Sequence, residues 1–131
     1  MQRFFFIIGS LLAGLSVAIG AATGHETSSL GELAHVWVAK ATRYQFYHSL
    51  ALIAVAISLD VWQGQRKVLA VAGCCFIGGI FCFSGSLYFM AFSGISAGYI
   101  TPLGGVFFLT GWLAMVVAGS KLAPPSTTLT N

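Results

Sequence analysis

The side chains best suited to chemistry lie together in one short stretch of mostly apolar sequence. Tyr44 lies four residues and Gln45 three residues before His48, so each pair occupies neighbouring surface if the stretch is a helix. In a membrane protein, an ionisable group at this depth usually faces a bundle interior or a water-filled cavity. His48 is therefore a candidate hydrogen-bonding partner for a lipid-like or quinone-like ligand, and Arg43 could bind an anionic headgroup.

A second polar group lies in the third long apolar stretch. Ser84 and Tyr88 are four residues apart and align on one helix face, with Ser86 between them. If each apolar stretch crosses the membrane once, both polar groups lie toward the same side of the membrane. We call this half of the protein the outer half. We predict a ligand pocket around His48 and Tyr88, with the candidate residues His25, Arg43, Tyr44, Gln45, His48, Ser84, Ser86 and Tyr88. The alternative is that His48 and Tyr88 are hydrogen-bonded struts between helices.

Other kinds of site lack the residues they need. No close pair among His25, His35 and His48 shares a helix face, and neither HxxxH nor HExxH occurs, so we predict no metal or haem ligand. No Ser or Cys lies in a Gly-x-Ser-x-Gly turn with a base in reach. Asp60 is the one acidic residue within an apolar stretch. We expect no catalytic residue, no cofactor and no enzymatic activity.

Four long apolar stretches must position these residues. They cover residues 4–22, 46–62, 68–92 and 100–122, in a chain that is 57% hydrophobic and 7% charged. A helix needs about 20 apolar residues to cross a bilayer, and barrel strands would alternate, which these stretches do not. We predict an all-α membrane protein whose four transmembrane helices form a compact bundle. Residues 1–122 would be its single domain, and residues 123–131 a disordered tail.

The basic residues indicate how the bundle is oriented. With four membrane-spanning helices, one side carries Arg3, Arg66, Lys67 and Lys121, and the other carries Lys40 and Arg43. Short cytoplasmic loops are enriched in Lys and Arg, so we expect both termini in the cytoplasm. This topology explains the net charge of +3 without a nucleic-acid partner. Residues 1–22 could also be a signal peptide; we interpret them as the first membrane-spanning helix.

The connections also carry structural signals. Residues 30–41 place apolar side chains at mostly three- and four-residue spacing, with Glu32, His35 and Lys40 on other faces. We predict an interfacial amphipathic helix between the first two transmembrane helices, with Trp37 at headgroup level, that runs on into the second. Thr101 and Pro102 predict the start of the fourth helix as N-cap and first helical residue.

Glycine is abundant within the apolar stretches. The chain has sixteen glycines, and Gly20 and Gly24 form a GxxxG pair. Small residues let helices approach closely where lipid provides no hydrophobic drive for association. We predict that close helix packing involves Gly20, Gly24, Gly78, Gly85, Gly104 and Gly105.

Four motifs in order resemble those of a known family. They are Gly20-Ala21-Ala22-Thr23-Gly24-His25, Arg43-Tyr44-Gln45-Phe46-Tyr47-His48, Phe83-Ser84-Gly85-Ser86-Leu87-Tyr88, and Thr101-Pro102-Leu103-Gly104-Gly105 continuing to Gly111-Trp112. The sequence is similar to the small integral-membrane family named domain of unknown function 423, whose first motif usually reads Gly-Ala-Phe-Gly-Ala-His. Ala22, Thr23 and Gly24 depart from that motif, whereas His25 is kept. The resemblance implies a four-helix protein of the bacterial inner membrane and implies no reaction.

Two functions fit these features best, and a transporter that depends on Asp60 ranks third. The first is a non-catalytic accessory or assembly protein that docks through glycine-rich helix faces onto other membrane-protein subunits or onto itself. The second is a binder of a lipid-like or quinone-like ligand in an outer-leaflet pocket around His48 and Tyr88. Membrane lipids are the other expected partners.

Overall fold

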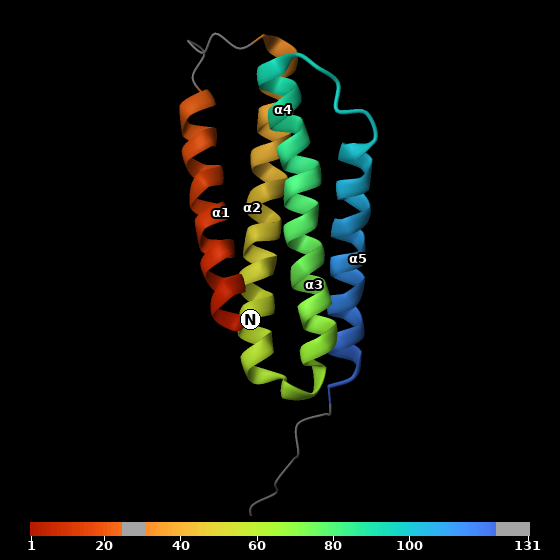
Figure 1. Ribbon diagram of the computed structural model, residues 1–131. Helices are drawn as coiled ribbons and strands as arrows, with labels where there is room; N and C mark the ends of the chain where they lie inside the picture. The colour runs from red at the N-terminus through yellow and green to blue at the C-terminus, as the bar shows by residue number, and fades with distance from the viewer. Residues whose placement is uncertain (25–30, 123–131) are drawn as a thin grey trace, which may run out of the picture.

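Four long helices lie side by side in the computed structural model, which describes residues 1–24 and 31–122 (Figure 1). The helices are α1 (Gln2–Thr23), α2 (Glu32–Val61), a third span of three segments, and α5 (Ile100–Ser120). The third span joins α3 (Arg66–Gly79), a π-helical turn η2 (Ile80–Gly85) and α4 (Ser86–Ser93), after a short 3₁₀ turn η1 (Gln63–Gln65). All four are long and apolar enough to cross a membrane, so the predicted all-α bundle of four helices is confirmed.

The predicted interfacial helix runs on into the second transmembrane helix, as expected, so it is not a separate element in the described part of the chain. Its residues from Glu32 onward are the first three turns of α2, which continues without a break to Val61. No Gly or Pro occurs between these two residues to interrupt the helix. Val38 and Ala41 are buried, so this part of α2 packs inward. His25 and the predicted tail at residues 123–131 lie outside the described residues.

The third span differs from the uninterrupted helix that the sequence predicts. Within η2 the helix widens to a π turn, a local feature that often marks functional sites. α4 then ends at Gly94, whose positive φ of 71° and N–H bond to the Met90 carbonyl form a left-handed cap.

The start of α5 corrects a further prediction. The N-cap residue is Tyr99 rather than Thr101, and no side chain caps it. The Thr101 hydroxyl instead lies 2.7 Å from the Ser86 hydroxyl of α4. Thr101 therefore links two helices.

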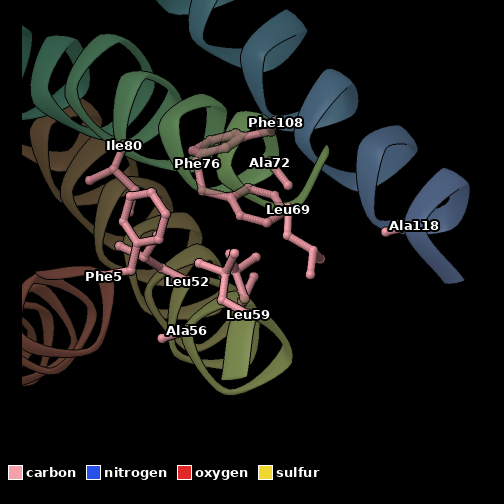
Figure 2. Close-up of a cluster of buried hydrophobic side chains, with 12 residues drawn as sticks. Phe5, Leu52, Ala56, Leu59, Leu69, Ala72, Phe76, Ile80, Phe108 and Ala118 are labelled. Carbon is pink, nitrogen blue, oxygen red and sulfur yellow. The ribbon is translucent and has the colours of Figure 1, made fainter. Parts of the chain in front are cut away.

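The apolar core lies between the helices and combines phenylalanine rings with facing glycines. Figure 2 shows Phe5 of α1, Phe76 of α3 and Phe108 of α5 in one cluster with leucines of α2 and α3, with Phe108 beside Phe76. An added Cβ at Gly73 would lie 2.5 Å from the Phe5 ring, and one at Gly79 would overlap the Phe108 ring. These glycines leave the space that the rings fill.

The six glycines predicted for close packing differ in what surrounds them. A Cβ at Gly104 would overlap the backbone nitrogen of Phe83, so α5 meets η2 backbone to backbone. Gly78 is in ordinary contact with the Phe107 ring. A Cβ at Gly20 or Gly105 would meet nothing within 4 Å, and at Gly24 and Gly85 the nearest atoms are the carbonyl oxygens of Gly20 and Ile80. Of the six, Gly104 alone makes a tight contact between helices.

α1 and α5, at the two edges of the bundle, are the least buried helices. α1 packs chiefly against α2, and α5 packs against the third span (Figure 1). In the most apolar 18-residue segment of each helix, 17% of the residues are buried in α1 and in α5. The corresponding shares are 44% in α2 and 39% in the third span. α2 and the third span are therefore the centre of the bundle, and α5 presents a broad face to its surroundings.

Candidate functional site

His48 lies at the centre of the predicted site and is buried on α2. Its Nδ1 lies 2.7 Å from the Tyr44 carbonyl oxygen, and Trp112 Nε1 of α5 donates to its Nε2 at 3.2 Å. Because a carbonyl only accepts and an indole N–H only donates, Nδ1 carries the proton and Nε2 is the acceptor. Both ring nitrogens of the neutral imidazole are thus occupied within the protein.

Aromatic rings surround His48 and link three helices. The imidazole stacks on Phe108 with ring centroids 3.5 Å apart and an angle of 9° between the planes. Tyr44 packs on Phe83 at 4.6 Å, and Phe76 meets Trp112 edge-on at 5.2 Å. We call these six residues, Tyr44, His48, Phe76, Phe83, Phe108 and Trp112, the aromatic cluster. It joins α2 to the third span and to α5.

A surface groove of ≈ 480 Å³ runs over the aromatic cluster along α5. Its lining is mostly apolar, and Trp112 is 45% exposed at its edge. The lining residues are Tyr44, His48, Phe83, Pro102, Gly105, Val106, Phe108, Leu109 and Trp112. Tyr88, Ser84 and Arg43 are not among them. The groove therefore contains only part of the predicted pocket.

Gln45 and Arg43 are directed toward α1 and do not line this groove. The buried Gln45 amide donates to the Leu12 carbonyl of α1 at 2.7 Å, and Ser16 of α1 donates to the Thr42 carbonyl of α2 at 2.7 Å. Arg43 lines a second groove, of ≈ 490 Å³, between α1 and α2. The polar groups here join α1 to α2.

The serines and the tyrosine of the third span have different surroundings. Ser86 bonds to the Phe83 carbonyl and to Thr101. The Ser84 and Tyr88 hydroxyl oxygens are buried and have no hydrogen-bond partner among the described residues. Burying an unpaired hydroxyl costs about 1–3 kcal/mol, so a hydrogen-bond partner for either hydroxyl would stabilise the protein.

The eight predicted residues are thus distributed over several places. Tyr44 and His48 line the groove on α5, Gln45 and Arg43 face α1, and Ser84, Ser86 and Tyr88 follow the third span, whereas His25 is outside the described residues. The sequence analysis did not identify Phe108, which stacks on His48. Nothing in the local sequence pattern signals this contact. Sequence reasoning named Trp112 only as the end of a family motif, and Ser16 not at all.

The described residues offer no metal centre. Within residues 1–24 and 31–122, no three His, Cys, Asp or Glu side chains lie close enough together to hold a metal ion. Cys74, Cys75 and Cys82 are free thiols.

Comparison with known proteins places the chain in a family. The family described as "Protein of unknown function (DUF423)" matches residues 18–105. A UPF0382 membrane protein of Staphylococcus epidermidis is 39% identical over 126 residues, covering 93% of this chain and 99% of that protein. The UPF0382 membrane protein YwdK of Bacillus subtilis is 40% identical over 123 residues, with 92% and 98% covered.

A more distant relative is the UPF0382 inner membrane protein YgdD of Escherichia coli K12, 32% identical over 127 residues, with 92% of each chain covered. No solved structure matches the chain. The resemblance drawn from the four motifs is confirmed. The chain is an integral membrane protein and belongs to the DUF423 family.

Proposed function

We propose that the protein is a non-catalytic accessory or assembly protein of a larger membrane complex. The single observation that carries this proposal is the state of His48, whose two ring nitrogens are both used within the bundle. A histidine bonded in this way has no free nitrogen for proton transfer, a ligand or a metal ion. It holds α5 against α2, which is the role of a strut.

The groove on α5 is the surface we assign to the partner. Gly105 has no atom within 4 Å of the position of a Cβ, and the neighbouring Val106 and Leu109 are exposed. No charged side chain lines this groove. Small residues beside exposed apolar ones allow a helix to approach closely within lipid. The proposed occupant is a transmembrane helix of a different subunit.

The proposed location is the bacterial inner membrane, with both termini in the cytoplasm. The relative YgdD carries "inner membrane protein" in its name. The start of α1, the α2–α3 turn and the end of α5 lie at one end of the bundle (Figure 1). Arg3, Arg66, Lys67 and Lys121 belong to these segments or directly follow them, and positive charge favours the cytoplasmic side.

Native separation of mildly solubilised membranes tests the accessory role. The parent chain should migrate with a larger assembly, and Gly105→Leu should release it because the new side chain fills the groove. Gly14→Leu is the matched control, since Gly14 is an exposed glycine on α1 with nothing within 4 Å of its Cβ position. Migration of the parent chain alone, or equal release by both variants, would count against the proposal.

A second candidate function is binding of a lipid-like or quinone-like ligand. The observation in its favour is the pair of buried hydroxyls on Ser84 and Tyr88, which have no partner among the described residues. They lie four residues apart beside the π turn, so a ligand carbonyl could bridge them. Lipids and quinones would be extracted from the purified parent, from Tyr88→Phe and from Ser84→Ala. Equal content in all three would exclude this candidate.

A further inference from the structure

Half of the basic residues of the chain line one hollow. The sequence holds six Lys and Arg residues, and Arg66, Lys67 and Lys121 line a cavity of ≈ 440 Å³. The remaining lining residues are Gln63, Gly64, Gln65 and Val68, so the lining contains no Asp or Glu. Three positive charges around one hollow repel one another. An anion placed between them would lower the energy of this end of the bundle.

Two distant parts of the chain build this hollow. η1 leads into α3 at Arg66, whose Nη1 donates to Gln63 Oε1 at 2.7 Å and so holds the guanidinium beside the turn. This bond uses one of the five N–H donors of the guanidinium. Lys121 directly follows α5, whose last turn lies beside the α2–α3 turn (Figure 1). The bundle itself therefore brings the three cations together.

The hollow lies where helices long enough to cross a membrane end, so in a bilayer we expect it at the depth of the lipid headgroups. α2 ends at Val61 and α5 at Ser120. Lys67 is the second residue of α3, Lys121 directly follows α5, and both are exposed. The partly buried Val68 gives the lining an apolar edge on the membrane side. A cationic rim with an apolar edge matches a phosphate group attached to a lipid backbone.

We propose that this hollow binds the phosphate of an anionic phospholipid headgroup. Arginine can hold a phosphate through two parallel hydrogen bonds, and lysine acts as a point charge beside it. Basic pockets between transmembrane helices are suited to anionic headgroups. The chemistry recognised is a phosphate oxyanion, which a lipid or free phosphate could supply.

The test measures thermal stabilisation of the full-length protein in neutral detergent as phosphatidylglycerol, phosphatidylcholine or inorganic phosphate is added. Phosphatidylglycerol should stabilise it with an affinity that falls about fivefold in Lys67→Gln and in Lys121→Gln, because each basic residue near the membrane surface contributes a similar factor. The double variant should lose more than either single variant, and about 25-fold only where the two contributions add, because both lysines share one phosphate. Arg3→Gln is the matched control, since Arg3 is exposed at the same end of the bundle and does not line the hollow.

The outcomes separate the possible sources of the phosphate. Inorganic phosphate could stabilise the protein as well as phosphatidylglycerol does and lose this effect in the lysine variants. That result would support the oxyanion site and identify free phosphate as its ligand. The proposal would be overturned if phosphatidylcholine stabilised the protein as well as phosphatidylglycerol, or if none of the three stabilised it. An equal loss of affinity in Arg3→Gln would also overturn it, because the effect would then be one of net charge.

Discussion

Gly104 gives the sharpest test of how α5 is held in the bundle. In Gly104→Ala the new methyl group would overlap the Phe83 backbone nitrogen and lie 2.7 Å from the Phe83 Cβ. Backbone atoms cannot rotate away, so α5 must move outward from η2. Such overpacking typically costs about 1–3 kcal/mol. The Ser86–Thr101 hydrogen bond lies one turn away and would also stretch, and bonds of this kind contribute ~0.6 kcal/mol within a membrane.

We therefore expect Gly104→Ala to lower the free energy of unfolding by about 2 kcal/mol, because the preference of alanine for the helix offsets up to ~1 kcal/mol of these costs. The matched variant is Gly105→Ala, whose methyl group would meet no atom within 4 Å. It should change stability by no more than about 1 kcal/mol, in the stabilising direction, because alanine favours the helix over glycine. Unfolding by sodium dodecyl sulfate in mixed micelles, followed by circular dichroism, measures both values. Equal effects of the two variants would refute the close approach of α5 to η2.

Two further predictions follow from the contacts and one from the distribution of basic residues. A double-mutant cycle of His48→Ala and Trp112→Phe should give a coupling free energy of about 0.6–1.7 kcal/mol in the same unfolding assay. A coupling near zero would show that the His48–Trp112 hydrogen bond does not hold α5 against α2. Tyr88→Phe should leave stability unchanged or raise it by up to ~1 kcal/mol in delipidated protein, since it removes an unpaired buried hydroxyl, whereas a loss would reveal a bound partner. In intact cells, an impermeant thiol reagent should label Lys40→Cys and spare Ser120→Cys, and the reverse pattern would invert the proposed topology.

The sequence was sufficient to predict the bundle because four long apolar stretches in a chain with 7% charged residues allow little else. It also predicted that His48 faces the bundle interior or a water-filled cavity, since an ionisable group is costly at this depth, and His48 is buried in the bundle. The bonds that pair it could not be predicted. The contact with Trp112 joins residues 64 positions apart, and the stacking on Phe108 depends on how α5 packs against α2.

The glycine predictions show a similar limit. Gly104 and Gly105 are adjacent in sequence and belong to the same motif, yet one touches backbone and the other is open. Helix geometry places neighbouring residues about 100° apart, so only the rotation of α5 in the bundle decides which faces inward. The same applies to Thr101, whose hydroxyl links to Ser86 instead of capping the helix. Composition predicts that small residues mediate packing, and tertiary structure selects which ones.

Photocrosslinking from the α5 groove in intact membranes tests the accessory role most directly. A photoreactive amino acid would replace Leu109, which lines the groove and is 72% exposed. The control is the same replacement at Leu11 of α1, which is 64% exposed. The proposal predicts a crosslink from position 109 to one specific membrane protein that position 11 does not give. Crosslinks to lipid alone from both positions would contradict the accessory role.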